Sequence, residues 1–194
     1  MISPRLTEFL ASLTRLDAVP VADVERMLLD AGGPVPPIWL DFHERYAGYV
    51  LELGDDSGVL GLAHERGTWL EPHALRLFRR QDRRVWGIAC ADIHPSYEYV
   101  LDTEGEFVGG PAESFDVYIE QFACIWTFTK TKFRGLPFKQ IRSPEFRAEV
   151  LARASLEFVA EASDRYSKVW MDDRYLVVDN PETSELKDGW QRLD

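Results

Sequence analysis

The fold is decided by residues 85–128, which read VWGIACADIHPSYEYVLDTEGEFVGGPAESFDVYIEQFACIWTF. The first seven residues form a short apolar run of strand length. Residues 97–102 then alternate with the period of two that is typical of a strand, and the chain returns at 106–109 after the turn Asp102–Gly105. Gly105 suits the left-handed backbone position that such a turn needs. The stretch therefore predicts a strand followed by an antiparallel hairpin.

A capped helix is expected after the hairpin. Ser114 is a residue type that accepts hydrogen bonds from the first N–H groups of a helix, and Asp116 lies near the positive end of the helix dipole. The apolar residues that follow have helical spacing and form one stripe: Phe115, Tyr118, Ile119, Phe122 and Trp126. We therefore expect a small antiparallel sheet that carries a helix.

Upstream of this stretch the pattern predicts three helices and two or three strands. The helices begin at Ser3-Pro4, run from Val21 to the stop at Gly32-Gly33, and run from Ile38 to Ala47. Strands are expected at 49–53 and 59–64, with a third around 68–70. The arginines of the cluster Arg76–Arg84 indicate a solvated loop, or a face paired with the chain's own carboxylates, more than a phosphate site.

Downstream, residues 130–139 are basic, but Gly135 and Pro137 indicate a connector. Ser143-Pro144 predicts the start of a long helix whose apolar stripe continues to Tyr166. A terminal hairpin is expected around Asp172-Asp173, and the polar tail from Asn180 is expected to be loosely held. The predicted organisation is an α+β domain over residues 1–142 and a C-terminal helix and hairpin, 143–194, packed on the same domain.

The chain of 194 residues is long enough for one such domain with an extension. Cys90 and Cys124 each lie in an apolar run and are interpreted as small core residues in a reducing compartment. The residues after Met1 do not resemble a signal peptide, and no apolar run reaches the roughly 20 residues of a membrane span, so we expect a cytoplasmic protein. A net charge of −11 argues against nucleic acid as the main ligand and favours a basic protein partner or simple solubility.

Acidic residues gather in the stretch that decides the fold. Residues 85–129 contain eight Asp or Glu and no Lys or Arg, which gives a local charge of −8. Because a strand alternates, Glu98 and Asp102 are expected on one face of the hairpin and Tyr97, Tyr99 and Leu101 on the other. The acidic face can bind a cationic partner. The alternative is an ordinary solvated sheet face that keeps an edge from aggregating.

An enzyme is not expected from the motifs. His94 is the most suggestive of the four histidines, because Asp92, His94 and Ser96 bring a carboxylate, an imidazole and a hydroxyl into one loop. Asp, Ser and Pro are also the ordinary components of turns. No spacing matches HExxH, CxxC, a nucleophile elbow or a phosphate-binding glycine motif, and no metal or cofactor is called for.

Two stretches resemble the SUKH superfamily of Smi/Knr-type domains. Residues 36–48, PPIWLDFHERYAG, are similar to the proline-led aromatic helix with which these domains begin. Residues 85–126 are similar to the family's later order of a Trp/Gly-containing strand, a hairpin with an Asp-x-x-Gly turn, and a Ser-Phe-capped helix. The resemblance covers roughly Leu16 to Phe128. The Arg76–Arg84 cluster and the C-terminal extension have no counterpart in it.

The resemblance implies a curved antiparallel sheet with helices on one side. It also implies a role, since many bacterial members are immunity proteins that bind and neutralise a toxin. The expected mechanism is occlusion of the toxin's active site by an acidic surface, and the expected contact residues are Asp92, Tyr97, Glu98, Tyr99, Asp102, Glu104 and Glu106. A regulatory or scaffold domain that binds a cellular protein is the alternative, and a hydrolase is the third possibility.

Overall fold

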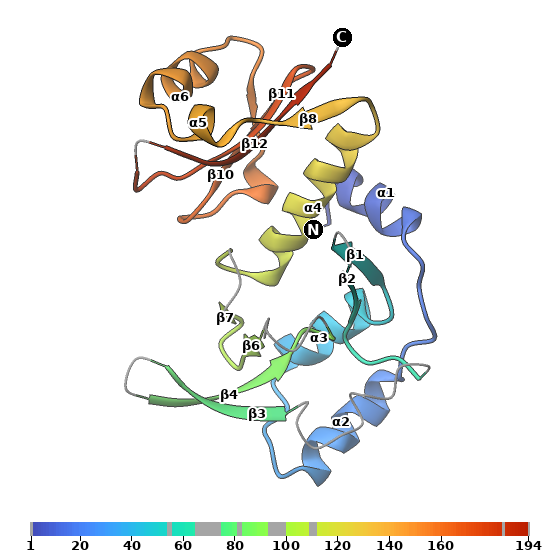
Figure 1. Cartoon of the computed structure of the whole chain (residues 1–194). Helices are drawn as coiled ribbons and strands as arrows, with labels where there is room; N and C mark the ends of the chain where they lie inside the picture. Colours follow the sequence, from blue (N-terminus) through green and yellow to red (C-terminus); the bar gives the residue numbers. More distant parts are fainter. Residues whose placement is uncertain are drawn as a thin grey trace. The chain divides into compact units, whose positions relative to one another are not determined.

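The structure, a computed structural model, describes residues 2–53, 56–64, 75–80, 83–92, 100–108, 112–183 and 185–193. The chain is an α+β protein with helices and antiparallel sheets, as the sequence predicts (Figure 1). It divides into two compact units, the central unit Leu10–Gly110 and the terminal unit Met1–Phe9 with Pro111–Asp194. This division differs from the boundary after residue 142 that the sequence predicts. Helix α1, Pro4–Ser12, begins in the terminal unit and ends in the central one.

The central unit combines two further helices with two antiparallel sheets in its described part. One sheet has the strand order β1-β2-β5 and the other β3-β4-β6-β7, where the sequence predicts a single curved sheet. The elements are α2 (Val21–Asp30), α3 (Pro37–Tyr46), β1 (Val50–Leu53), β2 (Asp56–Leu60), β3 (Leu75–Arg80), β4 (Arg83–Ala89), β5 (Ala91–Asp92), β6 (Val100–Asp102) and β7 (Phe107–Val108).

Helix α3 supplies the largest buried side chains of the central unit. Pro37 occupies its first turn, where a fixed φ and a missing N–H cost nothing. Trp39, Phe42, His43 and Tyr46 follow at the spacing of one helix face, and all four are buried. Trp39 and Tyr46 are completely inaccessible to solvent. This helix is the one that the sequence predicts from Ile38 to Ala47.

An irregular segment after α1 is held by backbone hydrogen bonds to two other parts of the central unit. Leu16 N donates to Gly48 O at 2.8 Å, and Val19 N donates to Leu62 O at 3.0 Å. Gly48 has a φ of 85°, and a Cβ there would overlap the carbonyl oxygen of Leu16. Only glycine allows the two backbones to approach this closely.

The terminal unit is built on a five-stranded antiparallel sheet of order β8-β12-β11-β10-β9. Its helices include α4, which connects it to the central unit along the chain, and two short helices that precede the last four strands. The elements are α4 (Phe115–Thr129), β8 (Phe133–Gly135), α5 (Phe138–Ile141), α6 (Pro144–Leu151), β9 (Glu157–Phe158), η2 (Ala160–Ala162), β10 (Lys168–Met171), β11 (Tyr175–Asp179) and β12 (Leu186–Arg192).

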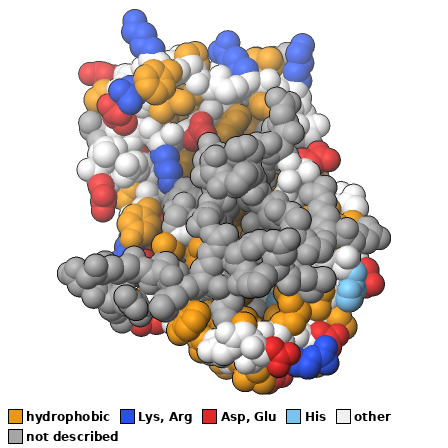
Figure 2. Space-filling view, turned by 60° about the horizontal axis from the view of Figure 1, so that its bottom comes forward, with side chains coloured by type: hydrophobic (Ala, Val, Ile, Leu, Met, Phe, Trp, Pro, Cys, Tyr) orange, Lys and Arg blue, Asp and Glu red, His pale blue; other side chains and the backbone are white. Residues whose placement is uncertain are grey.

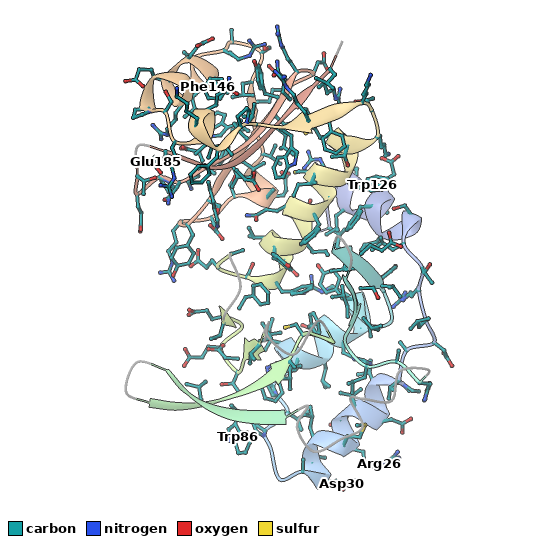
Figure 3. The ribbon with its side chains drawn as sticks, in the orientation of Figure 1. Arg26, Asp30, Trp86, Trp126, Phe146 and Glu185 are labelled. Carbon is teal, nitrogen blue, oxygen red and sulfur yellow. The ribbon has the colours of Figure 1, made fainter. Side chains whose placement is uncertain are left out.

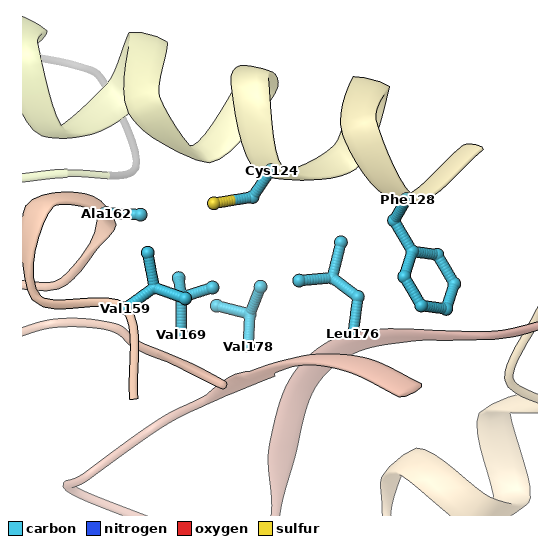
Figure 4. Packing of buried hydrophobic residues seen from close by; sticks show 7 residues of the cluster. All are labelled: Cys124, Phe128, Val159, Ala162, Val169, Leu176 and Val178. Carbon is cyan, nitrogen blue, oxygen red and sulfur yellow. The ribbon is translucent and has the colours of Figure 1, made fainter. Parts of the chain in front are cut away.

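Apolar clusters cover both faces of this sheet. On one face Cys124 and Phe128 of α4 pack against Leu176 and Val178 of β11 (Figure 4). On the other face Val177 packs in a separate cluster with residues of α5, α6 and β12. Successive residues of β11 therefore enter opposite cores, as the pleat requires. Helices therefore cover both faces of this sheet, α4 one face and α5 with α6 the other.

Local signals in the sequence are confirmed at the helix starts. The hydroxyls of Ser3, Ser114 and Ser143 accept hydrogen bonds from the N–H groups of Leu6, Val117 and Phe146, each three residues further on. The hairpin around Asp172 is also confirmed, because β10 pairs with β11. The basic connector contains β8, and the arginine cluster lies on β3 and β4 rather than in a loop.

Two C-terminal expectations are wrong. The helix that begins at Pro144 ends at Leu151, because Arg153 and Ser155 turn back to bind the Asp172 carboxylate at 3.3 and 2.7 Å. The tail from Asn180 is not loose. It forms β12, which pairs with β11 on one side and β8 on the other and lies inside the sheet.

Candidate functional site

The turn at 102–106 is the part of the predicted contact surface that the structure describes. The Asp102 Oδ1 atom accepts hydrogen bonds from the backbone N–H groups of Glu104 and Glu106 at 2.8 and 2.9 Å. Gly105 has a φ of 87°, which fits the left-handed position expected from the sequence. The Asp102 carbonyl also accepts a hydrogen bond from Trp39 Nε1 at 3.0 Å. The turn is thus fastened to helix α3.

The burial of Asp102 contradicts its predicted role as a contact residue. Asp102 has 0% of its surface exposed, since its carboxylate points inward to the backbone of its own turn. Glu104 is exposed and Glu106 is half-buried. The backbone of Asp92 lies in β5, but its side chain is outside the described residues, and Tyr97, Glu98 and Tyr99 lie outside them altogether.

Acidic side chains also reach the surface of the central unit on α2, α3 and the segments beside them. By sequence this unit carries 17 Asp and Glu against 9 Arg. Among its residues whose side chains the structure describes, two arginines are exposed, Arg15 and Arg26, and seven carboxylates are exposed: Asp17, Glu25, Asp30, Asp41, Glu44, Glu52 and Glu104. The five arginines of β3 and β4 are not among these side chains. Figure 3 labels Arg26 and Asp30 on α2. Most of these carboxylates lie outside residues 85–129, from which the sequence analysis predicts the contact surface. The sequence indicates them only through the polar side of the helical patterns of α2 and α3.

His43 lies in the core of the central unit and serves its structure. Its Nε2 lies 2.7 Å from the carbonyl oxygen of Val19, and its Nδ1 lies 3.5 Å from the backbone nitrogen of Leu62. A carbonyl can only accept and an amide N–H can only donate, so the ring is neutral, with its proton on Nε2. Burial lowers the pKa of His43 below its ordinary value, and the positive charge of Arg15 lowers it as well. The hydrogen bond to the Val19 carbonyl has the opposite effect and raises the pKa, but burial is the larger influence.

A polar cluster lies where α1 meets α4 in the terminal unit. Glu120 is buried and accepts hydrogen bonds from Ser3 N and Ser3 Oγ at 3.2 and 2.8 Å, which joins the start of α1 to α4. Arg5 Nη1 lies 3.2 Å from Cys124 Sγ. Nevertheless, burial raises the pKa of the Cys124 thiol to about 11, so the thiol stays protonated at neutral pH and is a poor nucleophile.

An open hollow of about 370 Å³ borders this cluster. Its lining is formed by Ser3, Pro4, Arg5, Glu8, Thr127 and Glu161. The lining residues combine one cation with two carboxylates and two hydroxyls, and they include no aromatic or large aliphatic side chain of the kind that is typical of a small-molecule site. Cys90 and Cys124 are both free and buried, as the sequence predicts.

Metal ligands and membrane spans can be assessed for the described residues. Within these residues, no three His, Cys, Asp or Glu side chains are grouped so that they could hold a metal ion. In the same part of the chain, no helix has the length and apolar character needed to cross a membrane. His94, the histidine singled out in the sequence, lies outside the described residues.

Models of protein families, curated proteins and solved structures give no significant match to this chain. The resemblance to the SUKH superfamily therefore stays a prediction, and the candidate site is the acidic surface of the central unit. We define this acidic surface as the seven exposed carboxylates named above together with Glu106. Figure 2 shows acidic, basic and hydrophobic side chains interspersed on one face of the molecule.

Proposed function

We propose that the chain is a non-catalytic protein-binding domain whose acidic surface covers a basic region of a partner protein. The observation that carries the proposal is the imbalance of exposed charge among the central-unit side chains whose exposure the structure describes, seven carboxylates against two arginines, a set that does not include the five arginines of β3 and β4. In the immunity role that the SUKH resemblance implies, the partner is a toxin and binding occludes its active site. A toxin that acts on nucleic acid needs a basic surface, which makes it complementary to this one.

Two properties of the acidic surface support a binding role. Negative charges that gather on one domain attract a cationic partner at long range and speed its association. In addition, the backbone that presents Glu104 is fixed by the Asp102 carboxylate and by Trp39 Nε1, so little conformational entropy is lost there when a partner binds.

A regulatory or scaffold domain would use the same surface, and the two roles differ in strength. A toxin inhibitor is expected to associate rapidly and to hold its partner tightly, with association slowing steeply as salt is added. An adaptor can bind its partner weakly. The affinity and its salt dependence therefore separate the two roles.

The first test captures partners with the tagged full chain from cells that produce it, at low and at high salt. Two variants reverse charge on the acidic surface, Glu104→Lys with Glu106→Lys and Asp41→Lys with Glu44→Lys. The matched control, Glu149→Lys with Glu182→Lys, makes the same change of charge at exposed positions of the terminal unit. We expect both surface variants to lose the captured protein and the control to retain it, with thermal stability measured for all three.

The second test uses the captured protein itself. If it is basic and toxic when produced alone, co-expression of the wild-type chain should restore growth, and the two surface variants should not. Retention of the partner by both surface variants would contradict the proposal. Capture of a harmless cellular protein through the same residues would support the scaffold role instead.

A further inference from the structure

Strand β8 forms one edge of the five-stranded sheet in the terminal unit. It pairs with β12 on one side, in the register Trp190↔Gly135, Gln191↔Arg134 and Arg192↔Phe133. Lys132 O accepts a hydrogen bond from Leu193 N at 3.0 Å, and Leu136 N donates to Gly189 O at 2.8 Å. Backbone groups alternate in direction along an antiparallel strand. The N–H and C=O groups of Phe133 and Gly135 consequently point away from β12, toward the open edge.

This open edge is accessible to another chain. All three residues of β8 are exposed, and 40% of the surface of Phe133 is accessible. A Cβ built on Gly135 would meet no atom within 4 Å. Within the described part of the chain, no hydrogen bond reaches the outward backbone groups of Phe133 or Gly135. A glycine with open space on an edge strand permits a second backbone to approach closely.

The charge around β8 is opposite to that of the whole protein. Residues 121–144 contain no Asp or Glu, and they contain five cationic residues, all exposed: Lys130, Lys132, Arg134, Lys139 and Arg142. Lys130 pairs with Glu8 at 2.9 Å, Arg134 binds Gln191, and Arg142 lies 3.8 Å from Glu185, which is labelled in Figure 3. For Lys132 and Lys139, no ion pair is formed with any described residue.

The side chains of β8 divide by face. Phe133 lies opposite Arg192, and Arg134 lies opposite Gln191 on the other face, where its Nη2 donates to Gln191 Oε1 at 2.9 Å. Lys132 lies two residues from Arg134 and therefore shares its face. A strand added at this edge would meet two cations on one face and an aromatic ring on the other. Acidic residues alternating with apolar ones would complement both faces.

We propose that the β8 edge binds an extended acidic segment of a partner protein, which adds to the sheet as a sixth strand. The peptide backbone pairs with Phe133 and Gly135, its carboxylates lie beside Lys132 and Arg134, and its apolar side chains contact Phe133. This surface lies in the terminal unit and is independent of the acidic surface of the central unit. Positive charge on an edge strand also discourages edge-to-edge aggregation, and that is the competing explanation tested below.

The probe is a fluorescent peptide of about seven residues that alternates Glu and Val, long enough to pass β8 and both its flanks. The matched control peptide alternates Lys and Val. We expect anisotropy titrations with the full chain to detect the Glu-Val peptide only, with binding that weakens as salt rises. Gly135→Pro should weaken binding at least about tenfold, because it removes an outward N–H while keeping every hydrogen bond to β12. Gly135→Ala should bind as the wild type does.

A second variant keeps the test independent of any folding defect in Gly135→Pro. Lys132→Glu with Lys139→Glu changes exposed side chains alone, and it should weaken the Glu-Val peptide and allow the Lys-Val peptide to bind. The Glu104→Lys/Glu106→Lys variant should leave peptide binding unchanged, which separates this inference from the proposed function. If neither peptide binds, the inference is overturned, and the cations at β8 serve only to discourage edge-to-edge aggregation. Binding of single-stranded oligo-dT that Gly135→Pro does not affect would assign the cations to nucleic acid and overturn it as well.

Discussion

The two units share one way of burying polar side chains, and the terminal unit adds a second. In the central unit, Trp39 Nε1, His43 and the Asp102 carboxylate bind backbone carbonyls or amides. In the terminal unit, the buried Asp164 carboxylate likewise accepts hydrogen bonds from backbone amides. The buried Asp179 carboxylate of that unit instead binds a charged side chain, the Arg147 guanidinium. The comparison shows that a buried carboxylate can be satisfied either by backbone amides that no sheet ladder pairs or by a cation from another element.

The largest expected effect is at Trp39, the largest fully buried side chain among the described residues. Trp39→Ala removes a fully buried ring and should lower the free energy of unfolding by about 4 kcal/mol. Trp39→Phe keeps most of the ring but loses the hydrogen bond to Asp102 O, so we expect about 2 kcal/mol. Urea unfolding gives the values, and hydrogen exchange resolved along the sequence should show the loss within residues 10–110. An equal loss in the β10–β12 strands would contradict the division into two units.

The next largest effect is expected at the ion pair between Arg147 and Asp179 in the terminal unit. Arg147 Nε and Nη2 lie 2.6 and 2.8 Å from the two carboxylate oxygens of Asp179, which is buried. The hydrogen bonds to Asp179 raise the pKa of Arg147. Arg147→Met leaves that carboxylate without its cation, and since the arginine is partly exposed we expect a loss of about 2–3 kcal/mol. The double variant Arg147→Met/Asp179→Leu should recover most of the loss in urea unfolding. A double variant as unstable as the single one would show that packing, rather than charge, sets the cost.

A smaller effect is expected at Asp102, where the acceptor atom matters more than the charge. Asp102→Ala removes the oxygen shared by the amides of Glu104 and Glu106 and should cost about 2 kcal/mol. Asp102→Asn keeps an oxygen in the same place and should cost less than half as much. Thermal unfolding of both variants measures the order. An asparagine variant as unstable as the alanine one would mean that the negative charge itself is required.

The smallest effect concerns pH and His43. Because burial holds the pKa of His43 below its ordinary value, the unfolded chain binds a proton that the folded chain excludes. Stability should therefore fall as the pH drops below about 6.5, by at most about 1.4 kcal/mol per pH unit from this residue. His43→Gln can still donate to Val19 O but does not titrate. Its stability curve between pH 7.5 and 5.5, measured by urea unfolding, should be flatter than that of the wild type; parallel curves would exclude His43 as the source.

Short-range signals in the sequence predict short-range structure well. Ser3, Ser114 and Ser143 cap helices because an N-cap depends on residues three positions apart. The prediction of one long helix up to Tyr166 is wrong, although the apolar residues from Phe146 onward have helical spacing. The same spacing is also compatible with what the structure contains, a short helix followed by a strand and a single helical turn. The reason for the break is the Asp172 carboxylate, which lies in a distant hairpin and binds Arg153 and Ser155.

The sequence predicts the negative charge of the candidate site but not which residues present that charge. Net charge and the acidic run point to an acidic surface, and the structure places exposed carboxylates on the central unit. The alternation of a strand cannot reveal that Asp102 turns inward, because that depends on the shape of the turn and on Trp39 from α3. The open edge at β8 was equally hidden, since an edge exists only once β12 has paired on the other side.

The join between Ser3 and Glu120 has a consequence for biosynthesis. These residues are 117 positions apart, so on a ribosome that adds about 5–20 residues per second the start of α1 waits roughly 6–23 s for its partner on α4. During that interval the whole of Leu10–Gly110 emerges and can fold on contacts of its own. Vectorial synthesis therefore delivers the central unit first, and the terminal unit closes afterwards by binding a segment that left the ribosome before the central unit did.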